Sequence, residues 1–98
     1  NDVIKMKIKE GFMLRSVADN YVAVPVGKAS SEFKGLINLN SVGAFIWKYL
    51  ENDTTILEVI NKVIDEYGID EELATRDVNT FINKLIEVVY TSYNKMSQ

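Results

Sequence analysis

The sequence predicts an α+β domain with a winged-helix-like frame, in which a short three-stranded antiparallel β-meander precedes three helices. Two observations carry this prediction. Short β-prone runs separated by turn residues occupy the first forty residues, and residues 36–89 hold apolar residues at three- and four-residue spacing. A chain of 98 residues is long enough for one domain with its own core. We therefore expect a single domain over residues 1–98, with its ordered core at about residues 12–91.

The first two strands are predicted as a hairpin over residues 12–17 and 21–26. Asp19 and Asn20 lie between them, and both residue types tolerate turn conformations. Pro25 has no backbone N–H to donate, which places it at a sheet edge or a strand end.

The third strand is predicted at residues 35–39, after a polar loop at residues 27–34. The first ten residues are polar and rich in lysine, so a frayed end or a poorly fixed strand is expected there. The tail after Tyr90 is expected to be loose.

The first helix is predicted to begin after Asn40, a residue type favoured as an N-cap. Its apolar stripe consists of Val42, Phe45, Ile46, Tyr49 and Leu50. Trp47 lies off this stripe, either partly exposed or against the sheet. Asn52 is expected to end the helix in a left-handed conformation.

The second helix is predicted to open with a capping box, in which Thr55 and Glu58 satisfy each other's backbone N–H groups, and to stop at Gly68. Its buried face consists of Ile56, Val59, Ile60, Val63, Ile64 and Tyr67. Asp70 is the expected N-cap of the third helix. That helix is predicted to run through Leu73, Val78, Phe81, Ile82, Leu85, Ile86 and Val89.

The composition argues against catalysis. The chain has no Cys and no His, which excludes thiolate nucleophiles, disulfides and the usual zinc and iron–sulfur sites. Its carboxylates have no partnered nucleophile, so we expect no catalytic residue, no metal site and no cofactor. No apolar run approaches the roughly 20 residues that span a bilayer, and a cytoplasmic protein is expected.

The charge distribution argues against the main alternative, a winged-helix DNA-binding transcription regulator. Residues 1–48 carry seven Lys and Arg against four acids, a net charge of +3, whereas residues 49–98 carry four against ten, a net charge of −6. The third helix would have to read DNA, yet it offers only Arg76 and Lys84 among several acids.

A peptide-binding groove is the better hypothesis. The apolar stripe of the third helix spans roughly 160°, wider than burial of one face requires. Ile82 and Ile86 lie toward one margin of the stripe, beside Thr75 and Asn79. A helix packed on two sides would explain the same width. The short third strand adds an open edge, whose unpaired backbone groups are a template for another strand.

These features resemble the PqqD family of peptide chaperones, the stand-alone form of the RiPP precursor recognition element. The resemblance covers about residues 12–91. Its pattern runs through Tyr21-Val22-Ala23-Val24-Pro25, Leu39-Asn40, Ala44, Ile46-Trp47, Leu50, Thr55, Ile60, Tyr67, Asp77-Val78, Phe81-Ile82 and Leu85. The chain departs from the family at Asn52-Asp53, where Asp-Gly is common, and at Val89-Tyr90, where Gly-Leu is usual.

The resemblance implies a non-catalytic adaptor for peptide modification of the PQQ-biosynthesis type. Such domains bind the leader segment of a ribosomally made precursor peptide and present it to a modifying enzyme, often a radical SAM maturase. The leader adds as a strand beside the third strand and against the third helix. From the open edge and the margin of the helix stripe, the predicted peptide-binding residues are Gly35, Leu36, Ile37, Asn38, Thr75, Asn79, Ile82 and Ile86. The sequence leaves two oligomeric states open, a monomer and a strand-exchanged homodimer, because open edges can exchange strands.

Overall fold

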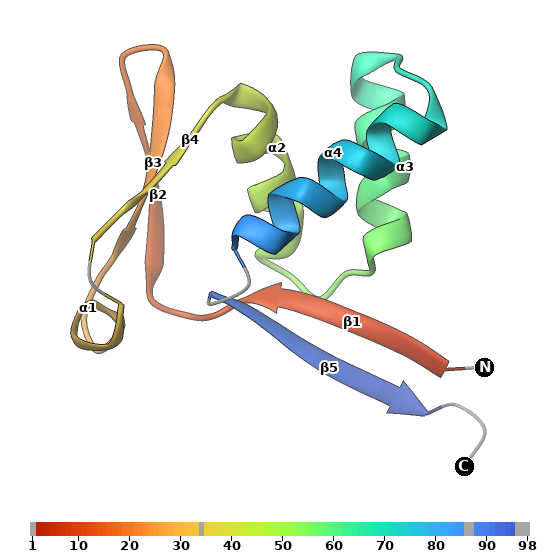
Figure 1. The fold of residues 1–98 in the computed structure, drawn as a ribbon. Coiled ribbons are helices and arrows are strands. Elements are labelled where there is room, and N and C mark those ends of the chain that lie inside the picture. The colour runs from red at the N-terminus through yellow and green to blue at the C-terminus, as the bar shows by residue number, and fades with distance from the viewer. Residues whose placement is uncertain (1, 34, 86–87, 96–98) are drawn as a thin grey trace.

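The computed structural model describes residues 2–33, 35–85 and 88–95, and it has the predicted α+β architecture (Figure 1). One antiparallel sheet has the strand order β2-β3-β4. Its strands are β2 (Phe12–Val17), β3 (Asn20–Pro25) and β4 (Ile37–Leu39). The three predicted helices follow as α2 (Ser41–Leu50), α3 (Ile56–Tyr67) and α4 (Glu71–Lys84). The winged-helix-like order of a β-meander and three helices is therefore confirmed.

The β2–β3 hairpin turns through Ala18 and Asp19, because Val17 pairs with Asn20. Asp19 was expected in this turn, but Asn20 already belongs to β3. Ala18 adopts a φ of 55°, in the left-handed region where a Cβ atom crowds the backbone. The hairpin thus places a strained alanine where glycine would be relaxed.

Replacing Ala18 by glycine is expected to stabilise the domain by about 0.5–1 kcal/mol. Relief of the left-handed alanine should outweigh the extra freedom that glycine gives to the unfolded chain. Thermal unfolding followed by circular dichroism should show a rise in Tm of about 2–8 °C. An unchanged or lowered Tm would mean that the strain at Ala18 is too small to outweigh the extra freedom of glycine in the unfolded chain.

The first helix, α2, begins as predicted but ends differently. The Asn40 side chain accepts a hydrogen bond from the Gly43 N–H at 2.8 Å. At the other end the C-cap is Glu51 in a right-handed conformation, and Asn52 is not left-handed. Trp47 is 1% exposed, with its ring edge-to-face against Phe12 of β2. Of the two alternatives for Trp47, packing against the sheet is therefore the observed one.

The second and third helices begin and end through side-chain caps. The capping box of Thr55 and Glu58 is present, and Gly68 ends α3 with a φ of 63°. Asp70 accepts a hydrogen bond from the Leu73 N–H at 2.8 Å. The helix α4 ends at Lys84 rather than near Val89, which is a correction to the sequence prediction.

The ends of the chain form a second sheet, contrary to the expectation of a frayed start and a loose tail. Strand β1 (Asp2–Ile8) pairs antiparallel with β5 (Val89–Lys95). Met6 of β1 also exchanges backbone hydrogen bonds with Thr54, which ties this two-stranded sheet to the loop before α3. Val89, which was expected in the helix, instead pairs with Ile8 of β1.

The loop predicted at residues 27–34 contains a short helix, α1 (Ala29–Glu32), which has no buried residue. The core lies between the three-stranded sheet and the helices, and the β1–β5 sheet closes it from below (Figure 1). Its fully buried side chains include Trp47, Ile46, Leu50, Val59, Val63, Val78 and Val88. Within the described ranges, no helix is long and apolar enough to cross a membrane.

Candidate functional site: a strand edge beside a groove

Along β2 and β3, hydrogen-bonded residue pairs alternate with non-bonded pairs. This alternation determines which backbone N–H and C=O groups are left unpaired at the edge of the sheet. Val26 donates its N–H to the Gly11 carbonyl at 2.7 Å, just beyond the end of the hairpin. Opposed residues in an antiparallel pair alternate between bonded and non-bonded pairs. Val24 and Val22 lie two and four residues before Val26, so their backbone groups also bond to β2. The residues between them, Tyr21 and Ala23, turn their backbone groups toward β4.

The same phase leaves alternate residues of β4 without a ladder partner. Leu39 and Ile37 lie opposite Tyr21 and Ala23, so their N–H and C=O groups bond to β3. Asn38 therefore turns its N–H and C=O to the outer edge. Leu36 lies two residues before Asn38, immediately before β4, so its N–H and C=O groups point to the same outer edge. Among the described strands, β4 has β3 as its one neighbour, so this edge is open.

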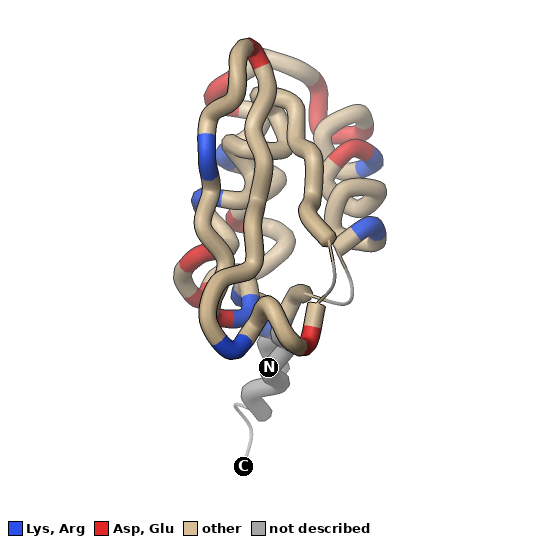
Figure 2. The backbone as a smooth tube through the Cα atoms, turned by 90° about the vertical axis from the view of Figure 1, so that its left-hand side faces the viewer, with Lys and Arg blue, Asp and Glu red and all other residues tan. Residues whose placement is uncertain are grey.

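The open edge of β4 lacks most of the features that usually protect sheet edges, although β4 itself is short, at three residues. Natural edges carry charged side chains, prolines or bulges that discourage pairing with another strand. Neither β3 nor β4 contains a charged residue, as the uncoloured strands in Figure 2 show. The proline of this sheet lies in β3, at position 25. Because Pro25 has no N–H to donate, the hydrogen-bonded pairing of β3 with β4 stops at Ala23 and Ile37.

A groove with a volume of about 320 Å³ lies between α2 and α4, next to the end of β4. Asn40 and the first turns of α2 form one side, and the outward face of α4 forms the other. Figure 1 shows β4 leading into α2, with α4 beside α2. The lining residues are Asn40, Val42, Gly43, Ile46, Asp77, Thr80, Phe81 and Lys84.

The absence of a side chain at Gly43 lets α4 pack closely on α2. A Cβ atom at this position would lie 2.9 Å from Cε1 of Phe81 and 3.5 Å from Cδ2 of Leu39. Gly43 costs about 1 kcal/mol in helix propensity relative to alanine, and the close contact explains that cost. The half-buried Phe81 ring lies over Gly43 and forms an apolar wall of the groove.

The structure separates the predicted site residues into two groups. The four on the strand side lie together: Leu36 is 57% exposed, Asn38 is exposed, Ile37 is half-buried, and Gly35 is exposed with a φ of 110°. They are the residues at and just before the open edge of β4.

The predicted residues of α4 lie on a different margin from the groove. With about 100° per residue, Thr80, Phe81 and Asp77 lie roughly 60–160° from Val78 on one side, whereas Ile82, Thr75 and Asn79 lie roughly 40–100° from it on the other. Ile82 is 7% exposed and belongs to the core. The Asn79 amide donates to the Thr75 carbonyl at 2.8 Å. Ile86 lies outside the described residues.

None of the groove residues was among the predicted site residues: Asp77, Thr80, Phe81 and Lys84 lie on α4, Val42, Gly43 and Ile46 lie on α2, and Asn40 is the N-cap of α2. A glycine inside α2 was the available signal, because such a residue marks close approach of another element. The stripe of α4 has two margins, and its spacing does not distinguish which margin faces the strand.

The described residues contain no cluster of three or more Asp and Glu side chains that could hold a metal ion. Burial, with a smaller effect from Glu66 and Tyr21, raises the pKa of Tyr67. That tyrosine packs edge-to-face on Phe45, on the opposite margin of α2 from Gly43. The arrangement at β4 and α4 therefore offers backbone hydrogen bonds and apolar contacts, with the charged side chains of Asp77 and Lys84 beside them.

Comparison with known proteins identifies the family. The sequence model described as Coenzyme PQQ synthesis protein D (PqqD) matches residues 20–88, which include β3, β4, α2, α3 and α4. The chain belongs to the PqqD family. The fold is similar to that of TbiB1, solved in complex with the TbiA(beta) leader peptide, with a TM-score of 0.64 and 23% identity. That similarity covers 83% of this chain and 88% of TbiB1. No curated protein sequence matches the chain significantly.

Proposed function

We propose that this PqqD-family protein is a non-catalytic adaptor that binds the leader segment of a ribosomally synthesised precursor peptide. The leader adds as a strand at the open edge of β4 and is presented to a modifying enzyme, for which a radical SAM maturase is the expected type. The single observation that carries this proposal is the uncharged, unpaired edge of β4 beside a groove to which Val42, Ile46 and Phe81 contribute apolar surface. Membership of the PqqD family and the fold shared with the leader-binding TbiB1 support it.

The β4 edge and the groove contribute different interactions to peptide binding. Asn38 and Leu36 donate and accept the backbone hydrogen bonds of the added strand, which are independent of the peptide sequence. Peptide residues opposite Ile37 and Leu39 point to the same face of the sheet as those side chains. Phe81 and Val42 provide the apolar contacts there. The contribution of Thr75, Asn79, Ile82 and Ile86 to peptide binding remains a prediction.

The decisive experiment is a titration with the leader segment of the precursor peptide encoded in the same gene cluster, synthesised with a fluorescein label and called the leader probe below. Fluorescence anisotropy should show saturable binding, and amide chemical shifts should change most at Leu36, Asn38 and the groove side of α4. No binding by any precursor encoded nearby, or shifts confined to the acidic segment at residues 65–72, would contradict the proposal.

The same titration with duplex DNA is expected to show no salt-sensitive binding. The described part of α4 carries Arg76 and Lys84 against four acids, Glu71, Glu72, Asp77 and the capping Asp70, and would repel phosphates. Anisotropy of a labelled 20-base-pair duplex should stay flat at low and physiological salt. A dissociation constant that falls steeply with decreasing salt would favour the transcription-regulator alternative instead.

A further inference from the structure

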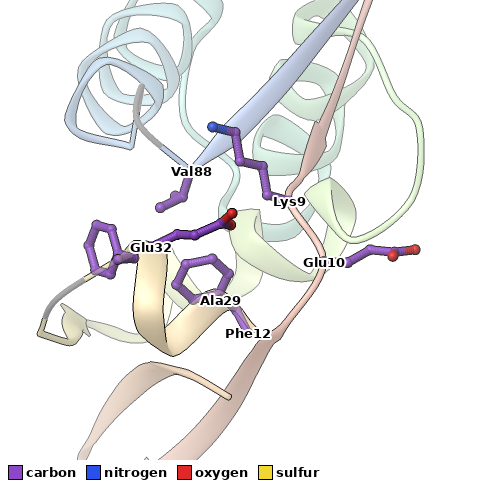
Figure 3. A pocket seen from close by; sticks show the side chains of 7 residues that line it. Lys9, Glu10, Phe12, Ala29, Glu32 and Val88 are labelled. Atoms are coloured by element: carbon purple, nitrogen blue, oxygen red, sulfur yellow. The ribbon is translucent and has the colours of Figure 1, made fainter. Parts of the chain in front are cut away.

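A second cavity lies at the other end of the β4 edge, under α1, and the proposed function leaves it unassigned. It has a volume of about 430 Å³. Ala29, Glu32 and Phe33 line it from the α1 side, and Lys9, Glu10, Phe12 and Val88 line it from the body of the domain. We call it the α1 pocket. Figure 3 shows the side chains of Phe12, Glu32 and Val88 around the cavity, with Glu10 pointing away from it.

Two aromatic rings, those of Phe12 and Phe33, line part of the α1 pocket. The rings of Phe12 and Phe33 meet edge-to-face, with centroids 5.6 Å apart and an interplanar angle of 69°. Phe12 makes a similar contact with Trp47, at 5.9 Å and 75°. Phe12 and Phe33 are only half-buried, so part of this cluster remains accessible from the pocket. A further ring can join such a cluster in the same edge-to-face manner.

The pocket is continuous in sequence with the open edge. Phe33 precedes Leu36 by three residues, so a strand added along β4 leaves the edge beside the pocket. Lys9 and Glu32 carry opposite charges on its two sides. A charged peptide side chain in the pocket would be repelled by one of these two residues and attracted by the other. An uncharged peptide side chain would not be repelled by either.

From these observations we infer that the α1 pocket is a second seat for the bound peptide, which takes one uncharged aromatic side chain just beyond the strand-forming segment. This inference rests on the proposed function. The backbone groups of β4 accept any sequence, whereas the α1 pocket makes binding depend on one particular side chain.

The proposal is tested by a substitution in the protein that fills the α1 pocket with a large side chain. Glu32→Trp places a large ring in the α1 pocket, and the core is spared because α1 has no buried residue. Ser31→Trp is the matched control, because Ser31 is an exposed neighbour on α1 that does not line the pocket. Circular dichroism and thermal unfolding should show that both variants fold like the parent.

The leader probe is then synthesised with Tyr and with Ala at each position in turn, and each pair is titrated against the three proteins. One position outside the strand-forming segment should favour Tyr over Ala by about tenfold with the parent and with Ser31→Trp. With Glu32→Trp that preference should disappear. If every Tyr preference survives in Glu32→Trp, or none exists in the parent, the second seat is wrong.

This result is distinguishable from failure of the proposed function. If the leader probe does not bind the parent at all, the adaptor proposal fails. If the probe binds at the β4 edge but the Tyr preference is absent, only the α1 pocket assignment fails.

Discussion

Replacing Asn38 by proline is expected to abolish binding of the leader probe while the domain stays folded. The Asn38 N–H points to the open edge in the derived hydrogen-bond phase, so proline there removes no bond between β3 and β4. It does remove a donor that an added strand needs, and its ring obstructs the approach of another backbone. Affinity should fall by more than about tenfold, with a change in stability of no more than about 1 kcal/mol.

Two controls separate the backbone from the side chain at this position. Asn38→Ala removes the side chain but keeps the N–H, and it should bind the leader probe within about threefold of the parent. Ile37→Pro removes an N–H that bonds to Ala23, and it should destabilise the fold by about 2–3 kcal/mol. If Asn38→Pro unfolds the domain and Ile37→Pro does not, the assignment is wrong: the Asn38 N–H then bonds to β3 and the Ile37 N–H faces the open edge.

The second large effect concerns which margin of α4 faces the peptide. Thr80 and Asn79 are adjacent and exposed, but Thr80 lines the groove and Asn79 lies on the margin that the sequence predicted. Thr80→Arg should weaken binding of the leader probe by more than about tenfold, because the long side chain occupies the groove and a buried charge is costly. Asn79→Arg should bind within about twofold.

The two variants are well matched for this comparison. Each adds one positive charge at nearly the same height on α4, so any long-range electrostatic effect on the peptide is shared. Both positions are exposed, so neither change should alter the core. The reverse pattern, with Asn79→Arg weak and Thr80→Arg normal, would restore the sequence-predicted margin of Thr75, Asn79 and Ile82.

The helices were predictable because their signals are local. Asn40, Thr55 with Glu58, and Asp70 each bond to a backbone N–H within three residues, so a short window of sequence contains the whole motif. The same holds for Gly68, whose left-handed conformation ends α3. Such motifs require no knowledge of the tertiary fold.

The β1–β5 sheet was not predictable because its partners are remote in sequence. Met6 is in register with Thr91, and only this pairing converts a lysine-rich start into a strand with buried Met6 and Ile8. The same pairing ends α4 early, since Val89 bonds in a ladder although the apolar spacing continues. Local spacing alone cannot distinguish these outcomes.

The candidate site was predictable on its strand side and ambiguous on its helix side. The residues before Asn40 were identified as an edge from a short third strand that no fourth strand follows. Around α4, however, apolar side chains extend to both margins, and the contact between Gly43 and Phe81 is what shows where the groove lies.

Proline at position 25 has a consequence for how selective the protein must be. By ending the β3–β4 ladder at Ile37, it leaves an edge with only Asn38 and Leu36 in bonding phase, hence up to about four backbone hydrogen bonds for a guest strand. At about 0.5–1.5 kcal/mol each, these supply roughly 2–6 kcal/mol. Micromolar affinity needs about 8 kcal/mol. Main-chain pairing alone therefore leaves an arbitrary polypeptide loosely held, and the remaining affinity has to come from side chains that only a cognate sequence carries.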